Sequence, residues 1–158
     1  MNSTGKAVLI GAASVGGLFL LTNIAKANSL YNRFEVVPSI NVHNVGIGGL
    51  VLNVDAKIIN PSNGQIKVRK PTIKLWSEDK KTLLGMSDVY SEIQTLEKWS
   101  DITFSNMRIS IPVLSLPSSI LSALKNGYIK MVVEVITTVN GLTVEKEEIV
   151  ELSIPKLW

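Results

Sequence analysis

An uncharged run from residue 7 to residue 25, bracketed by Lys6 and Lys26, most constrains what this chain can fold into. As an α-helix that rises about 1.5 Å per residue, the run is roughly 28 Å long, close to the hydrocarbon thickness of a bilayer. It predicts a transmembrane anchor over residues 1–27 and a stalk over residues 28–35. The residues that represent the span are Ala7, Leu9, Gly11, Gly16, Gly17, Phe19, Leu21 and Ala25.

Two alternatives compete for this run. A secretory signal peptide has a basic start, an apolar centre and a small-residue exit, which Lys6, the run and the sequence around Lys26 follow loosely. A helix buried in a core needs a large protein around it, and the rest of this chain reads as one β domain. We interpret the run as a retained single-pass span, which predicts a membrane location and the lipid bilayer as a partner. Small residues four apart, such as Ala12 and Gly16, would let a second helix approach closely.

Composition narrows the classes of partner. The formal charge is +3, and Lys6 and Lys26 supply two of these charges, so the remaining chain is nearly neutral. No run of Lys and Arg is interleaved with aromatic residues, which argues against a nucleic-acid partner. The chain has no cysteine, so disulfides and a cysteine-linked lipid anchor are excluded.

Residues 36–158 are expected to form one β domain. Apolar residues alternate with polar ones from Leu50 to Ile58, which is typical of a strand with one buried face. The turn-rich sequence 60–64 ends that strand. The alternation then changes parity near Lys70-Pro71 and again before Met107, where a bulge or bend would absorb the slip.

The rest of this domain continues the pattern. Residues 117–127 predict its single short helix, capped by Ser118 or Ser119 and ended by Asn126-Gly127. Asn140-Gly141 between two apolar runs predicts a tight hairpin. With a first strand over residues 36–47, the chain reads as seven or eight short strands. We therefore predict a mainly β fold, an antiparallel β-sandwich with one short helix after the anchor.

The order of these segments resembles the group-two late embryogenesis abundant proteins, the water-stress and hypersensitive-response (WHy) domain family. The resemblance implies an immunoglobulin-like or fibronectin-like sandwich, no enzymatic activity and, in many members, an N-terminal span. Asn60 and Pro61, which follow an apolar strand, form the motif most specific to the family. Arg69-Lys70-Pro71 is not typical of plant members and is more similar to uncharacterised proteins of bacteria and their phages. The other matching segments are Ile66-Lys67-Val68, Leu84-Gly85-Met86-Ser87, Ile109-Ser110-Ile111-Pro112 and the final Asn-Gly hairpin.

No group of residues predicts catalysis, a cofactor or a metal. His43, the single histidine, lies on an expected strand, and no serine sits in a glycine elbow. Glu145, Glu147 and Glu148 read as the polar face of a strand rather than as a metal site. The glycines between residues 46 and 49 are followed by a strand and not by the helix that a phosphate loop needs. We expect no small-molecule substrate.

The three tryptophans complete the candidate residues. Trp76 ends an apolar strand and reads as core or edge packing, whereas Trp99 in a polar turn and Trp158 at the end of the sequence are candidate contact residues. Together, these features favour a non-enzymatic, membrane-anchored structural or assembly protein. Its head would contact other structural proteins or copies of itself, as in a minor virion protein of a membrane-containing phage. The alternative is a stress-protective or lipid-binding module.

Overall fold

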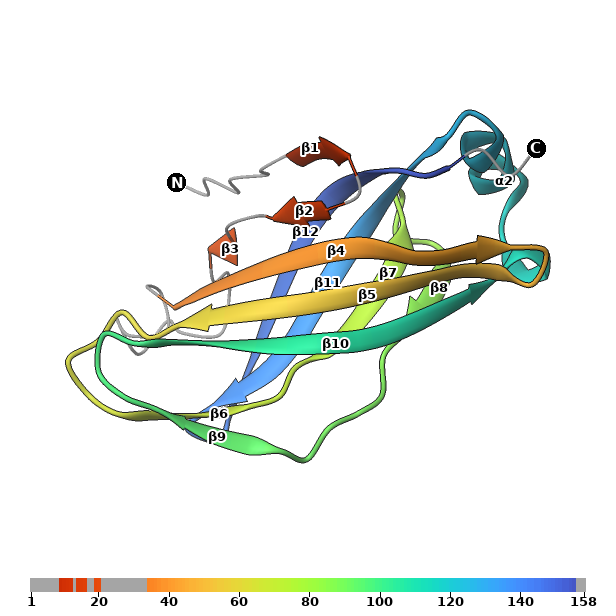
Figure 1. Ribbon diagram of the computed structural model, residues 1–158. Helices are drawn as coiled ribbons and strands as arrows, with labels where there is room; N and C mark the ends of the chain where they lie inside the picture. The colour runs from red at the N-terminus through yellow and green to blue at the C-terminus, as the bar shows by residue number, and fades with distance from the viewer. Residues whose placement is uncertain (1–8, 13, 17–18, 21–33, 156–158) are drawn as a thin grey trace.

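The computed structural model describes residues 9–12, 14–16, 19–20 and 34–155, and it shows two β-sheets packed face to face (Figure 1). One sheet is built on three long antiparallel strands. Its strand order is β10 (Asp101–Pro112), β5 (Gly49–Ile59) and β4 (Glu35–Gly46), with the short β2 (Ser14–Gly16) and β3 (Phe19–Leu20) both paired to β4.

The second sheet is centred on the long hairpin of β11 and β12. β11 pairs with β12 along its whole length, and with β6 and β7 on its other side. β9 extends the sheet from β6, β8 extends it from β7, and β1 adds to β12 in parallel. The bounds of these strands are β1 (Leu9–Ala12), β6 (Ile66–Arg69), β7 (Thr72–Ser77), β8 (Leu83–Met86), β9 (Ile93–Leu96), β11 (Tyr128–Val139) and β12 (Leu142–Ser153).

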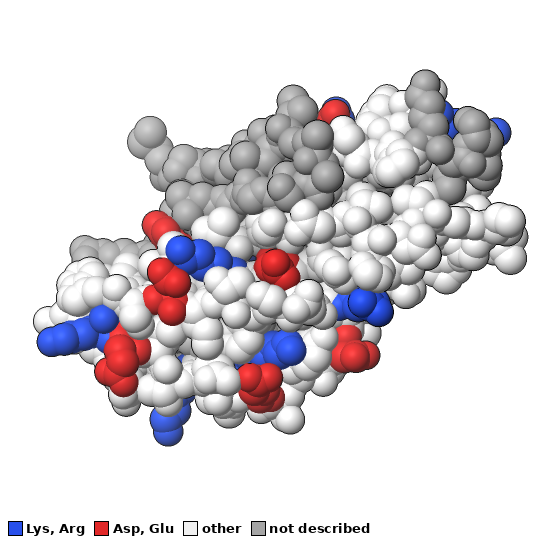
Figure 2. All heavy atoms as spheres, in the orientation of Figure 1, with Lys and Arg blue, Asp and Glu red and all other residues white. Residues whose placement is uncertain are grey.

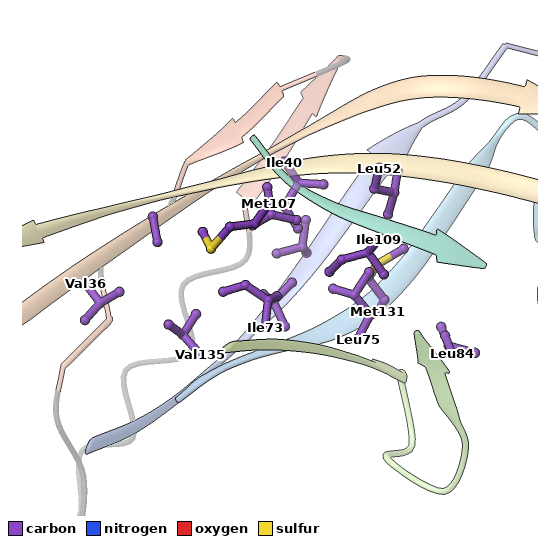
Figure 3. Packing of buried hydrophobic residues seen from close by; sticks show 14 of the residues in the cluster. Val36, Ile40, Leu52, Ile73, Leu75, Leu84, Met107, Ile109, Met131 and Val135 are labelled. Carbon is purple, nitrogen blue, oxygen red and sulfur yellow. The ribbon is translucent and has the colours of Figure 1, made fainter. Parts of the chain in front are cut away.

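The core lies between the sheets because the expected alternation holds on both inner faces. Along β5, every second residue from Leu50 to Ile58 is buried, and β10, β7 and β11 show the same period of two. Side chains of the two sheets meet in the middle (Figure 3). The labelled members of this cluster are Val36, Ile40, Leu52, Ile73, Leu75, Leu84, Met107, Ile109, Met131 and Val135.

Both predicted changes of parity are confirmed. The β10–β5 register shifts between Phe104 and Met107, where Asn106 adopts φ +60° and its N–H donates to Asp55 Oδ1 at 2.8 Å. Lys70 and Pro71 separate β6 from β7, and these two strands pair with different stretches of β11. The mainly β, sandwich-like prediction is therefore confirmed for the part of the chain that the structure describes.

The helix and the hairpin lie where the sequence places them. Asn140 (φ +51°) and Gly141 (φ +83°) form the tight turn between β11 and β12. The helix α2 (Ser118–Lys125) follows the short 3₁₀ helix η1 (Val113–Ser115), and Ile120 and Leu124 are buried beneath α2. The expected serine cap is wrong, because Pro117 occupies the N-cap and no side chain caps the helix.

The predicted transmembrane helix is also wrong. Leu9, Gly11, Gly16 and Phe19 lie in β1, β2 and β3, which pair with β12 and β4 (Figure 1), and Ala7, Gly17, Leu21 and Ala25 lie outside the described residues. Among the described residues, no helix has the length and apolar character needed to cross a membrane. Sheet edges offer unpaired N–H and C=O groups, and an apolar run can satisfy its backbone there as well as in a helix. Phe34, placed in the predicted stalk, is fully buried in the sandwich.

Candidate functional site: an uncharged tip of the sandwich

The turn between β4 and β5 exposes an isoleucine at one end of the sandwich. Ile47 sits in the sequence Gly46-Ile47-Gly48-Gly49, and its relative exposure is 99%. Gly49 adopts φ +139°, and a Cβ on it would lie 2.2 Å from the Ile111 carbonyl oxygen of β10. Only glycine fits this close approach, so the turn is held against β10 while Ile47 projects from it.

A second exposed aliphatic side chain lies in a segment at the same end of this sheet. Gly49 pairs with Pro112, the last residue of β10, and η1 begins at the next residue. Leu114 lies in η1, and its relative exposure is 101%. The turn at residues 46–49 and η1 at residues 113–115 therefore leave neighbouring strands at the same end of the sheet. We call these two segments the apolar tip.

The apolar tip lies in a region without charge. No Asp, Glu, Lys or Arg occurs between residues 36 and 54 or between residues 109 and 124, which are the stretches that lead into and out of the two segments. In Figure 2, charged spheres lie over the left and lower parts of the molecule and in a few places along its top, and the right-hand end at the β4–β5 turn is white. At this end, exposed aliphatic side chains lie on segments without charged side chains. Contact of these segments with an apolar surface would therefore not remove a charge from water.

A surface cavity of about 550 Å³ lies between the β7–β8 turn, α2 and the start of β11. Its lining is mixed, with Ile120 and Tyr128 on one side and Ser77 and Asp79 on the other. The Asp79 carboxylate is already occupied, because it accepts hydrogen bonds from Ser77 Oγ at 2.6 Å and from the Lys81 N–H at 3.1 Å. These bonds, the Ser77 bond first, lower the pKa of Asp79 and fix the turn. One oxygen of the Asp79 carboxylate therefore holds the β7–β8 turn together.

Asn60, the residue of the family motif, is buried at the opposite end of β5 from the apolar tip. Its Nδ2 donates to the carbonyl oxygens of Gly64 at 2.7 Å, Glu97 at 2.9 Å and Leu96 at 3.4 Å. Its Oδ1 accepts from the N–H of Ser62 at 3.1 Å and from Ser62 Oγ at 2.7 Å. One amide thus ties the loop after β5 to the end of β9, which gives the motif a structural role.

The candidate contact tryptophans do not join the apolar tip. Trp99 is 67% exposed, with φ +56°, and its N–H donates to the Ser62 carbonyl oxygen at 3.1 Å, so it belongs to the Asn60 end of the molecule. β5 spans 11 residues, so the two ends are about 35 Å apart. Trp158 lies outside the described residues. Trp76 lies on the outer face of the second sheet, where its Nε1 donates to Glu134 Oε2 at 3.0 Å.

The residues considered as catalytic or metal-binding candidates do not lie together. His43 is exposed at the irregularity of β4, and its Nδ1 lies 3.5 Å from Asn53 Nδ2. Glu145 and Glu147 are exposed on β12, whereas Glu148 is buried on the inner face, so the three carboxylates do not share a site. In the part of the chain that the structure describes, no group of three His, Cys, Asp or Glu residues could hold a metal ion.

Sequence reasoning missed the residues of the apolar tip and the buried pair Lys146 and Glu148. The sequence did contain a signal for the apolar tip. Ile47 is a large aliphatic residue within a glycine-rich turn, and a turn at the surface leaves such a side chain exposed. The parity of β12 also placed Lys146 and Glu148 on the same face as Val144 and Val150, which are buried. That parity is the sequence signal that identifies the pair.

Comparison with known proteins supports the fold alone. No protein-family model and no curated protein matches this chain. A solved protein from Archaeoglobus fulgidus matches with a TM-score of 0.51 at 14% identity, and the match covers 76% of this chain and 97% of that protein. The names of the solved structures compared here do not bear on the late embryogenesis abundant proteins, so that resemblance stays a prediction.

Two further solved structures show weaker likeness. A β-glucuronidase of Bacteroides uniformis matches with a TM-score of 0.48 and 18% identity, over 74% of this chain and 13% of the glucuronidase. The putative ApaA protein of Bordetella pertussis matches with a TM-score of 0.44 and 12% identity, over 77% of this chain and 92% of that protein. This chain therefore spans a small fraction of the glucuronidase, and neither match bears on function.

Proposed function

We propose that this chain is a non-enzymatic structural module that rests on the surface of a lipid bilayer through its apolar tip. The observation that carries the proposal is the nearly complete exposure of Ile47 and Leu114 on adjacent turns of an uncharged end. Single aliphatic side chains scattered over a surface need no explanation, but two that project together from a charge-free end do. The bilayer interface accepts such side chains without a matching pocket.

The energetics suit reversible binding. Burial of each aliphatic side chain contributes roughly 1.5–3 kcal/mol, so the two together contribute about 3–6 kcal/mol. A single myristoyl chain, with an association constant of about 10⁴ M⁻¹, gives only marginal membrane binding, and the apolar tip is at most comparable. Copies held together in an assembly would bind far more tightly than one copy, because later contacts become intramolecular. Weak bilayer binding by a single apolar tip therefore favours a protein that acts as one of several copies in an assembly over a protein that binds the membrane as a single copy.

A minor structural protein of a membrane-containing phage is the specific form of this proposal. Sedimentation of the native material through a density gradient tests it by following this chain and its copy number. We expect migration with a nucleic-acid-containing particle at fixed stoichiometry. Migration with ordinary membrane vesicles would contradict the virion assignment and leave a cellular role at the bilayer.

The apolar tip itself is tested with the double variant Ile47→Asp, Leu114→Asp. Two carboxylates in place of two aliphatic side chains should lower the partition coefficient onto phosphatidylcholine vesicles by at least about 30-fold, because the apolar gain is lost and charge must be desolvated. Co-sedimentation of the full chain with vesicles measures this effect. Both positions are solvent-exposed, so the thermal unfolding midpoint should stay unchanged.

The matched control is Val89→Asp. Val89 is 75% exposed in the connection between β8 and β9, outside the two segments of the apolar tip. The control should bind vesicles like the unsubstituted chain. An equal loss in both variants would show that the effect is general charge and not contact through the tip.

A further inference from the structure

The surface cavity beside α2 is large enough for a small ligand. Its volume of about 550 Å³ lies within the range of about 300–1,000 Å³ that small-molecule sites occupy. Its walls come from three separate elements: the β7–β8 turn, α2 and the first residues of β11. Because α2 and β11 contact each other, packed secondary structure bounds the cavity on two of its sides.

The cavity lies at the same end of the molecule as the apolar tip. Pro117, which lines the cavity, follows Leu114 by three residues, and three residues span at most about 11 Å. Figure 1 shows α2 and the β4–β5 turn together at one end of the sandwich. A bilayer that receives Ile47 and Leu114 would therefore bring its headgroups within reach of the cavity.

The charged groups that line the cavity favour a cation. Glu78 and Asp79 belong to the β7–β8 turn, and no hydrogen bond or ion pair among the described residues occupies the Glu78 carboxylate. The second oxygen of Asp79, Oδ2, lies 3.9 Å from the Nζ of the exposed Lys81, and exposed pairs of this kind contribute little. The cation among the described lining residues, Lys130, has its Nζ 3.6 Å from Glu151 Oε2. The balance of charge at the cavity is therefore negative.

The uncharged part of the lining suits a cation that carries methyl groups. Ile120 and Ile129 supply apolar surface, and Tyr128, which is 42% exposed, supplies an accessible aromatic ring. Aromatic faces attract organic cations, and quaternary ammonium groups in particular. A primary ammonium is strongly hydrated, whereas a trimethylammonium group donates no hydrogen bond and presents its charge through methyl groups. The combination of carboxylates, a phenol ring and aliphatic side chains therefore fits a quaternary ammonium.

We infer that the cavity binds a phosphocholine group, the headgroup of a zwitterionic lipid, with its trimethylammonium between the Tyr128 ring and the carboxylates of Glu78 and Asp79. The Ser119 hydroxyl, which also lines the cavity, then offers a hydrogen bond to the phosphate. The inference rests on the proposed bilayer contact and names the class of lipid: the apolar tip enters the interface while the cavity holds a headgroup. A soluble phosphocholine ester carries the same chemistry, so the two sources need separate experiments.

Titration of the isotope-labelled full chain with soluble phosphocholine tests the cavity without a membrane. The amide resonances of Glu78, Ser119 and Tyr128 should shift with a dissociation constant in the millimolar range, and that of Val89 should not shift. Choline chloride should cause the same shifts and sodium phosphate should not, because the ammonium group carries the attraction. Cavity resonances that do not move at about 50 mM phosphocholine overturn the inference.

Two variants test the residues assigned to the ammonium group. Glu78→Lys reverses the charge at an exposed position and should weaken the binding of phosphocholine at least about 10-fold. Tyr128→Leu keeps an apolar side chain but removes the ring, and it should weaken the binding about 5-fold. Glu145→Lys is the matched control, because it makes the same change of charge at an exposed position of β12 outside the cavity lining. Unchanged affinity of Glu78→Lys, or an equal loss in Glu145→Lys, overturns the inference.

Vesicles separate a failure of this inference from a failure of the apolar tip. Bilayers of phosphatidylcholine and of an uncharged galactolipid both offer an apolar interior, but the galactolipid carries no ammonium group. The full chain should bind phosphatidylcholine at least about 10-fold more tightly, and Glu78→Lys should lower this binding to the galactolipid level. Equal binding to both bilayers overturns the headgroup assignment and leaves the apolar tip. Binding of soluble phosphocholine without binding to either bilayer contradicts the bilayer contact and excludes the lipid as the source of the ligand.

Discussion

Replacing Asn60 by alanine is expected to lower the free energy of unfolding by about 3 kcal/mol. The substitution leaves the carbonyl oxygens of Gly64, Leu96 and Glu97 without the amide that now donates to them. It also removes the acceptor of the Ser62 N–H and Oγ. Because Asn60 is 1% exposed, water does not replace these bonds without opening the loop. Urea unfolding followed by tryptophan fluorescence measures the change.

Two further variants separate the hydrogen bonds from the loop itself. Asn63→Ala changes an exposed amide three residues away and should alter stability by less than about 0.5 kcal/mol. Asn60→Asp keeps the shape but turns a carboxylate oxygen toward the three carbonyl oxygens, so it should be at least as destabilising as Asn60→Ala at pH 7. Equal stability of Asn60→Ala and Asn63→Ala would contradict the structural role of the motif.

The second large effect is a stability minimum between about pH 7 and pH 8. The pKa of Glu148 is raised by burial from 4.5 to about 7, so its contribution to stability is present below pH 4.5 and lost as the pH rises through 7. The pKa of Lys146 is lowered by burial from 10.5 to about 8, so its contribution is present above pH 10.5 and lost as the pH falls through 8. The profile of stability against pH therefore has two limbs, the decline between pH 4.5 and 7 and the rise between pH 8 and 10.5. Along each limb, the free energy of unfolding changes by about 3 kcal/mol.

Single substitutions should remove one limb at a time. Glu148→Gln abolishes the decline in stability between pH 4.5 and 7, and Lys146→Met abolishes the rise between pH 8 and 10.5. Unfolding in urea at a series of pH values, at a protein concentration where the chain is monomeric, measures both limbs. A profile that Glu148→Gln leaves unchanged would show that Glu148 keeps its ordinary pKa.

The long strands and their inner faces could be predicted because one physical rule governs them. A strand with one buried face must alternate, and from Leu50 to Ile58 the sequence alternates without interruption. The tight turn at Asn140-Gly141 followed from the preference of these residues for positive φ. Both parity changes were visible for the same reason, since a bulge shifts the alternation by one residue.

The parts that could not be predicted depend on contacts between distant segments. The run from residue 7 to residue 25 is uncharged in any conformation. The pairing of its described residues 9–12, 14–16 and 19–20 with β12 and β4 becomes possible only once those strands form a sheet edge. The exposure of Ile47 follows from the close approach of Gly49 to β10, which lies about sixty residues further along the chain. No local pattern at Leu114 shows that η1 ends beside that turn.

The most direct test of the bilayer contact uses the absence of cysteine from this chain. A single cysteine introduced as Ile47→Cys carries an environment-sensitive nitrobenzoxadiazole label at the apolar tip, and Val89→Cys carries the same label elsewhere on the surface. On addition of phosphatidylcholine vesicles, the label at position 47 should shift to shorter wavelength and be quenched by lipids with a quencher in the acyl chains. The label at position 89 should remain in water. A label at position 47 that stays in water while the protein sediments with the vesicles would contradict the proposal that the apolar tip contacts the bilayer.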